Sequence, residues 1–301
     1  MTTEMQNSQP NNYQKIKTRK SSQNWFQALV LLAPAAIWLL LLLVLPTLII
    51  IQLSFVPGIK PGDIVNPSGF ENYLRILDPL YLQVIKRSLL LALATTAICL
   101  VLGFPVAFWI ARMAPKRWRN LLLLAFILPL WTSSLLRSYA WITILRPTGL
   151  LNTVLANFNL PALDLLNSTK GVLIGMSYNL LPYMVLILYA SLEKLDKRLL
   201  EAASDLGANS IQVFAKVTVP QVFPGIAAAS MLVFITGLGD YVNPELLGGA
   251  ASMTAARLIY NQFLGTAQNW GFGSALSTVL ILLVSLAIAF LIKFGEGAPE
   301  R

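Results

Sequence analysis

The side chains of this sequence with the clearest potential for chemistry are a few charges and aromatic rings near the ends of apolar runs. Asp240 and Glu245 follow the apolar run that ends at Gly239, and Arg137 lies near the end of another. Charges next to lipid are costly and are candidates for function. Carboxylates there would favour a cation, which aromatic rings can also contact through their faces. The candidates for lining a substrate pathway are Trp131, Arg137, Tyr139, Trp141, Tyr178, Asp240, Tyr241, Glu245 and Trp270.

Each of these candidates also has a purely structural interpretation. Asp164, Asp240 and Glu245 are compatible with solvated carboxylates at a membrane surface. Arg137 could extend its head group to water or pair with an acid. The rings could form the aromatic belt that marks the edge of a membrane. The sequence leaves both interpretations open.

Catalytic chemistry has little support in this sequence. The chain contains no histidine and a single cysteine, Cys99, which lies in an apolar run. It therefore lacks the commonest general base and metal ligand, and neither a cysteine-based metal site nor an internal disulfide can form. It also lacks a G-x-x-x-x-G-K-[ST] loop for phosphates, an H-E-x-x-H motif and a cluster of carboxylates suited to hydrolysis. We predict that the chain is not an enzyme and binds no cofactor or metal.

The longest polar stretch between apolar segments is Glu201 to Pro220, with the sequence EAASDLGANSIQVFAKVTVP. We predict a short helix over Leu199–Leu206, a break at Gly207, and further helical turns over Ser210–Val217 that Pro220 ends. An ordinary amphipathic connector is the alternative. Small side chains let a partner surface approach closely, and a glutamate near a helix start suits the helix dipole or a basic partner. The residues expected to carry such a contact are Glu201, Ala202, Ala203, Asp205, Leu206, Gly207 and Pro220.

The composition places most of the chain in lipid. Of the 301 residues, 56% are hydrophobic and 12% are charged, whereas soluble domains carry roughly 25% charged residues. The mean hydropathy is +0.67. The net charge of +9 could suggest nucleic acid, but the basic residues lie beside apolar runs, so membrane topology explains them better. We predict an all-α polytopic membrane protein with no nucleic-acid partner.

Six apolar runs are each close to the roughly 20 residues that cross the hydrocarbon core. They lie at about 29–53, 88–111, 121–136 (or on to 145), 171–192, 222–239 and 274–292. The predicted organisation is a disordered N-terminal tail over 1–28, a six-span domain over 29–293 containing the polar loop 193–221, and a short tail over 294–301. Residues 70–77, between the first two spans, could form an interfacial helix.

The distribution of basic residues predicts which side of the membrane each loop faces. With the N-terminus inside, the inner segments hold 14 lysines and arginines and the outer segments hold 8. The inner loop 114–120 is short, which is where this rule works best. Both termini and the Glu201–Pro220 stretch are therefore expected on the cytoplasmic side.

The Glu201–Pro220 stretch resembles the EAA loop of bacterial ABC-importer permeases. The resemblance rests on Glu201-Ala202-Ala203, on Gly207 after three intervening residues, and on Val217-Thr218-Val219-Pro220, where Val217 and Val219 replace the usual Ile and Leu. It implies the permease fold of a type I ABC importer, in which this loop is a coupling helix that docks into a groove on a separate ATPase subunit.

Four further stretches resemble permeases of spermidine/putrescine importers. They are Leu128–Trp141, Ser191–Lys197, Pro244–Gly249 and Asn269–Gly273. This resemblance implies a polyamine permease in a prokaryotic inner membrane. It also implies two ATPase subunits, a second related permease or a second copy of this chain, and an extracytoplasmic binding protein as partners. The alternatives are an importer for iron, sulfate or another small ligand, and a membrane scaffold without transport activity.

Overall fold

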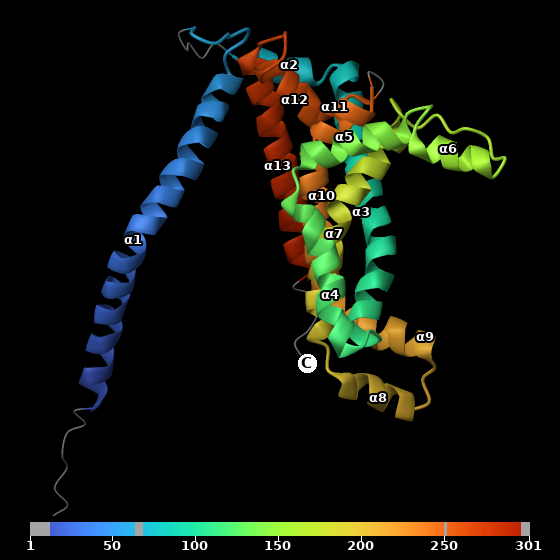
Figure 1. Cartoon of the computed structure of the whole chain (residues 1–301). Coiled ribbons are helices and arrows are strands. Elements are labelled where there is room, and N and C mark those ends of the chain that lie inside the picture. The colour runs from blue at the N-terminus through green and yellow to red at the C-terminus, as the bar shows by residue number, and fades with distance from the viewer. Residues whose placement is uncertain (1–12, 64–68, 250–251, 296–301) are drawn as a thin grey trace, which may run out of the picture. The chain divides into compact units, whose positions relative to one another are not determined.

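The computed structural model describes residues 13–63, 69–249 and 252–295, and these residues form helices and no strand. The chain divides into two compact units, Met1–Gln52 and Leu53–Arg301 (Figure 1).

The first unit consists of most of one long helix, α1 (Tyr13–Ser54). Its apolar part, Val30–Ser54, has a mean hydropathy of 2.6 and is long enough to cross a membrane. The helix begins at Tyr13, so residues 13–28 are helical where the sequence predicts a disordered tail. Lysine, arginine and glutamine are good helix formers, and extending an existing helix needs no new nucleation. Residues 1–12 and 296–301 of the two predicted tails lie outside the described residues.

In the second unit, four long helices form the main bundle. They are α3 (Pro79–Arg112), α7 (Thr169–Glu193), α10 (Val219–Leu238) and α13 (Trp270–Gly295). With α1, they are the five helices of the described residues that are long and apolar enough to span a membrane, and counting a bent pair of helices as one span raises this number to six. This arrangement confirms the predicted all-α fold.

The bent pair corrects the prediction for the third span. Helix α4 (Lys116–Ile127) continues into a 3₁₀ turn (Leu128–Trp131), and α5 (Ser134–Leu145) then leaves at 94° with α6 (Leu150–Asn157) after it. The helix therefore bends sharply after Trp131, where the sequence predicts a straight span running on to 136 or 145. Pro129 removes a backbone donor, and the N–H and hydroxyl of Thr132 both donate to the carbonyl of Pro129 at 3.2 and 2.8 Å, which caps the turn.

The core of the second unit lies between α3, α7 and α10. Cys99, Met184, Leu188 and Val233 are fully buried there. Small residues let the helices approach closely. At Gly225 of α10, for example, an added Cβ would lie 2.2 Å from the hydroxyl oxygen of Ser191 on α7, so only glycine fits there. Close backbone approach at small residues is typical of helix packing in membranes.

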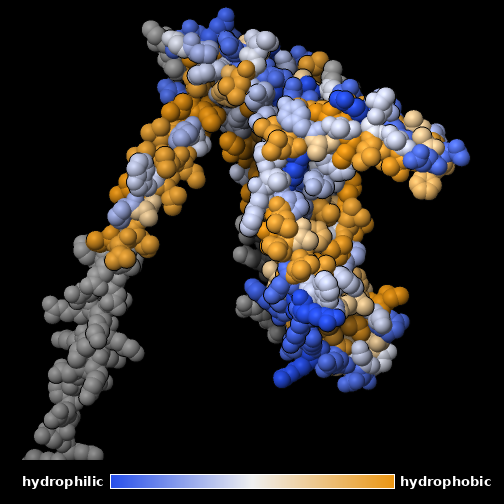
Figure 2. All heavy atoms as spheres, in the orientation of Figure 1, coloured by the Kyte–Doolittle hydropathy of each residue, from blue (hydrophilic) through white to orange (hydrophobic). Residues whose placement is uncertain are grey.

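Short helices cover the two ends of this bundle. At one end lie α8 (Lys197–Asp205) and α9 (Ser210–Val213); at the other lie α2 (Glu71–Ile76), α11 (Val242–Leu247) and α12 (Ala255–Phe263) (Figure 1). Helix α2 forms where the sequence predicts an interfacial helix. Hydrophilic side chains gather at the end that carries α8 (Figure 2).

Candidate functional site

The loop between α7 and α10 begins with a well-capped amphipathic helix. The carboxylate of Asp196 accepts a 2.9 Å hydrogen bond from the backbone N–H of Arg198, which makes Asp196 the N-cap of α8. Helix α8 runs from Lys197 to Asp205, two residues earlier at its start than the predicted Leu199–Leu206.

Gly207 ends α8 through a complete Schellman motif. The N–H of Ala208 donates to the carbonyl of Ala203 at 3.1 Å, and the N–H of Gly207 donates to the carbonyl of Ser204 at 2.9 Å. Gly207 has a φ of +86°, a conformation that glycine adopts without strain. The predicted break at Gly207 is therefore present, and its direction is set by a backbone angle that other residues resist.

The second half of the loop differs from the prediction at Pro220. Asn209 and Gln212 form a reciprocal capping box at the start of α9. A π-helical turn, Phe214–Thr218, then leads directly into α10, so Pro220 lies inside continuous helix and does not end it. The wider hydrogen-bond spacing of a π turn accommodates a proline that has no N–H to donate.

Most of the predicted contact residues lie on the surface of this loop. Glu201, Ala202, Asp205 and Gly207 are exposed, and Ala203 is half-buried. Leu206 is 89% exposed. Ile211, which was not among the predicted contact residues, is 78% exposed. Two large aliphatic side chains at the polar end of the bundle suit contact with another protein surface.

Both ends of the loop are attached to α3. Where α7 ends, the guanidinium of Arg112 donates to the backbone carbonyl of Leu195 at 2.7 Å. Where α10 begins, the ring of Phe214 packs edge-on against Phe104 and Phe108, with centroids 5.5 and 5.9 Å apart. A force on the loop would therefore reach α3 as well as α7 and α10.

A cavity of about 270 Å³ lies between α5, α7 and the end of α10. One carboxylate, one guanidinium and two tyrosines contribute to its wall. The lining residues are Ser134, Arg137, Asn179, Leu180, Tyr183, Thr236, Gly239, Asp240, Tyr241 and Val242.

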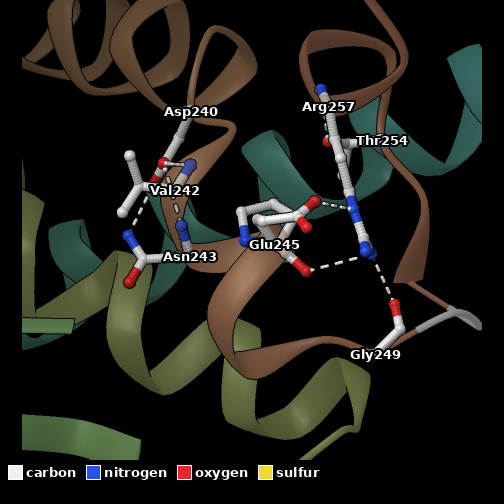
Figure 3. Close-up of polar contacts among 8 residues, drawn as sticks. Asp240, Val242, Asn243, Glu245, Gly249, Thr254 and Arg257 are labelled. Carbon is white, nitrogen blue, oxygen red and sulfur yellow. Dashed lines mark hydrogen bonds and ion pairs between the residues drawn. The ribbon is translucent and has the colours of Figure 1, made fainter. Parts of the chain in front are cut away.

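Asp240 lies just beyond α10 and caps the start of α11. One carboxylate oxygen accepts from the backbone N–H groups of Val242 and Asn243 at 2.9 and 3.2 Å, and the other accepts from the Asn243 side-chain amide at 2.5 Å (Figure 3). Burial raises the pKa of the Asp240 carboxyl above its usual range, and the hydrogen bonds from Asn243 and Val242 oppose that shift.

Asn243 connects this carboxylate to two other helices. Its amide oxygen accepts from the hydroxyl of Ser138 on α5 at 3.0 Å and from the amide of Asn179 on α7 at 3.4 Å. Both Ser138 and Asn243 are fully buried. A Cβ at Gly175 would lie 2.6 Å from the Asn243 amide oxygen, so only glycine leaves room for the network at that point of α7.

Three of the nine predicted pathway residues line the cavity, namely Arg137, Asp240 and Tyr241. The guanidinium of Arg137 also donates to the carbonyl of Pro129 at 2.8 Å, across the bend between α4 and α5. Tyr241 stacks on Tyr260 with ring centroids 4.7 Å apart.

The other six predicted pathway residues lie outside the cavity lining. Trp131 and Tyr139 are 78% and 55% exposed. The rings of Trp141 and Tyr178 pack edge-to-face, and the indole of Trp270 donates to the carbonyl of Phe263 at 3.2 Å.

Glu245, the last of these six, forms an ion pair with Arg257 (Figure 3). The same arginine donates to the backbone carbonyl of Gly249 at 2.5 Å. Glu245 therefore holds α11 and α12 together at this end of the bundle.

Four polar wall residues were not among the candidates: Ser134, Asn179, Tyr183 and Thr236. Asn179 and Tyr183 lie one turn apart within a mostly apolar span, and this spacing was the signal that the sequence offered. Within the described ranges, no group of three or more Asp, Glu, Cys or His side chains could hold a metal ion.

Comparison with known proteins gives a consistent result. A family profile described as "Binding-protein-dependent transport system inner membrane component" matches residues 103–294. The spermidine/putrescine transport system permease protein PotB of Haemophilus influenzae is 41% identical over 253 residues, which cover 83% of this chain and 88% of the relative. PotB of Escherichia coli K12 is 40% identical over 253 residues, with coverages of 83% and 91%.

Solved structures are similar in fold. A chain of a bacterial ABC transporter involved in the import of the acidic polysaccharide alginate superposes with a TM-score of 0.72 at 19% identity, covering 94% of this chain and 100% of that chain. A chain of the MetNI methionine ABC transporter gives a TM-score of 0.54 at 16% identity, with coverages of 74% and 100%.

Proposed function

The chain belongs to the family of binding-protein-dependent transport system inner-membrane components, and from this premise we propose that it is the permease subunit of a polyamine importer. It is a multi-pass membrane protein and a transporter subunit, not an enzyme; ATP hydrolysis takes place on a separate subunit. The observation that carries the polyamine assignment is the similarity to spermidine/putrescine permeases over most of the chain.

We propose that the α8–α9 loop docks into the ATPase. The contact residues would be Glu201, Ala202, Ala203, Asp205, Leu206 and Gly207, with Ile211 added by the structure, and Pro220 at the junction with α10. Closure of the ATPase subunits on ATP would move the loop. Its attachments at Leu195 and Phe214 would pass this motion to α3, so that the spans open alternately to the two sides.

The proposed assembly contains this chain, a second related permease or a second copy, two ATPase subunits and an extracytoplasmic binding protein. The proposed permease domain is 29–293, with the coupling loop at 193–221. The inner-membrane orientation would place both termini and α8 in the cytoplasm. Lys116, Arg117 and Arg119 at the start of α4 support this orientation, since short cytoplasmic loops are rich in basic residues.

The cavity supports a route for cations. It combines a buried carboxylate, Asp240, with the rings of Tyr183 and Tyr241, which can contact a cation through their faces. Arg137 in the same wall is the observation that favours the alternative, an anionic ligand. The remaining candidates, Trp131, Tyr139, Trp141, Tyr178, Glu245 and Trp270, would contact the cargo only in a differently arranged state of the transporter.

An uptake experiment tests the polyamine assignment. Cells that retain the native partner subunits but lack this gene are expected to lose uptake of labelled spermidine, and a plasmid copy is expected to restore it. Unlabelled putrescine should compete with uptake in wild-type cells, whereas sulfate and ferric iron should not. Unchanged uptake in the deletion strain, with no second polyamine route active, would remove the polyamine assignment and leave the family assignment standing.

A further inference from the structure

Two polar atoms in the cavity wall are buried and have no hydrogen-bond partner among the described residues. They are the amide oxygen of Asn179 and the Nε of Arg137. Asn179 is only 5% exposed, so water outside the protein does not compensate its oxygen. A buried acceptor without a partner costs roughly 1–3 kcal/mol, so such atoms call for an explanation.

The orientation of the Asn179 amide follows from its neighbours. The NH₂ group of Asn243 must face the Asp240 carboxylate, because that carboxylate can only accept there. The Asn243 oxygen then faces Ser138 and Asn179, and Asn179 must turn its own NH₂ group toward that oxygen. This sequence of contacts leaves the oxygen of Asn179 without a partner; the atom is covered in this conformation and becomes reachable to a ligand when the cavity wall opens.

We propose that the side-chain oxygen of Asn179 accepts a hydrogen bond from one ammonium group of the cargo as it passes through the cavity. This inference rests on the proposed polyamine function and adds a specificity-determining residue to it. Asp240 acts as a positioning residue: it fixes Asn243, which fixes Asn179, and its charge favours a cation nearby. The rings of Tyr183 and Tyr241 contact the methylene chain and the charge.

The side chains of the cavity wall favour weak, brief binding of an ammonium group over tight binding. An amide oxygen is a neutral acceptor and holds an ammonium more weakly than a free carboxylate does. The guanidinium of Arg137 in the same wall opposes a second positive charge. The cavity therefore holds a single ammonium group and releases it, which a transport route requires.

The test uses the complete transporter in proteoliposomes, with spermidine-loaded binding protein at saturating concentration. Asn179→Leu removes the acceptor at similar volume, and Asn179→Gln retains an amide that can accept from the cargo and donate to Asn243. Ser177→Ala is the matched control, because Ser177 lies on the same helix with a buried hydroxyl but does not line the cavity. Labelled spermidine uptake and ATP hydrolysis are both measured.

Asn179→Leu is expected to lower the maximal uptake rate about tenfold or more, because the free energy of a hydrogen bond to a charged group corresponds to a factor of at least about ten. ATP hydrolysis stimulated by the loaded binding protein should stay near the wild-type rate, because the coupling loop is intact. Asn179→Gln should keep a substantial part of the uptake and Ser177→Ala all of it.

Three results would overturn the inference. Wild-type uptake by Asn179→Leu would mean that the amide oxygen does not contact the cargo. Equal losses in Asn179→Leu and Asn179→Gln, or a parallel loss of stimulated ATP hydrolysis, would mean that the residue has a structural role. The absence of spermidine uptake in the wild-type transporter would instead remove the proposed function itself, which makes the two failures distinguishable.

Discussion

Replacing Gly207 with valine is expected to reduce ATP-driven uptake at least about tenfold while the protein still inserts into the membrane. Gly207 has a φ of +86°, and a β-branched residue in this region is strained by roughly 1–2 kcal/mol. Apart from the two chain neighbours, no heavy atom of the described residues lies within 4 Å of the position that a Cβ would take, so the side chain meets no steric obstacle. A change in the backbone angles of residue 207 relieves the strain, and this change alters the direction of α8 relative to α9.

Gly207→Asn is the matched control, because asparagine tolerates the left-handed conformation better than valine does. It should retain a substantial part of the uptake at the same amount of protein in the membrane. The measurement is uptake per amount of complex, together with co-purification of the ATPase subunit. Normal uptake in Gly207→Val would contradict the proposed role of this loop in coupling.

Asn243→Leu is expected to destabilise the second unit strongly. The fully buried side chain of Asn243 links Ser138, Asn179 and Asp240, and leucine leaves all three polar groups without this partner. Removing one partner from a buried network that includes a carboxylate costs on the order of 3 kcal/mol. A lower apparent melting temperature in detergent and less protein in the membrane are the expected readouts.

The double variant Asn243→Leu/Asp240→Asn separates charge from packing. With the carboxylate replaced by an amide, no buried charge loses its partner, so the double variant should be more stable than Asn243→Leu alone. Neighbouring residues in one network are expected to be non-additive in this way. Strict additivity of the two substitutions would mean that the Asp240–Asn243 contact contributes little to stability.

Local sequence patterns predicted the features that depend on neighbouring residues. The break at Gly207 follows from the type of one residue, and the long spans follow from the lengths of the apolar runs. The helix ahead of Gly207 was placed within two residues at its start. These features need no information about distant parts of the chain.

The bend after Trp131 and the course of the chain through Pro220 were predicted wrongly. The apolar run continues past Thr132, and hydropathy does not register a change of direction, although Pro129 was a signal for it. Pro220 was expected to end the helix. It does not, because the π turn before it has already changed the hydrogen-bond spacing.

The cavity could not be predicted in full because its wall, and the hydrogen-bond network behind that wall, join residues that are distant in the sequence. Asn179 and Asn243 are 64 residues apart, and Ser138 and Asn243 are 105 apart. A single sequence carries no record of these contacts. The sequence did indicate Arg137 and Asp240, because charged residues near the ends of apolar spans are candidates for function. An uncharged amide such as Asn179 gives a weaker signal.

The most direct measurement of the central claim is spermidine accumulation in proteoliposomes that contain this permease, its partner permease and the ATPase. We expect labelled spermidine to accumulate only when both ATP and the loaded binding protein are present, and Gly207→Val to abolish accumulation. If the binding protein stimulates ATP hydrolysis but spermidine does not accumulate, while another ligand does, the chain is a permease for that ligand and the polyamine account is wrong.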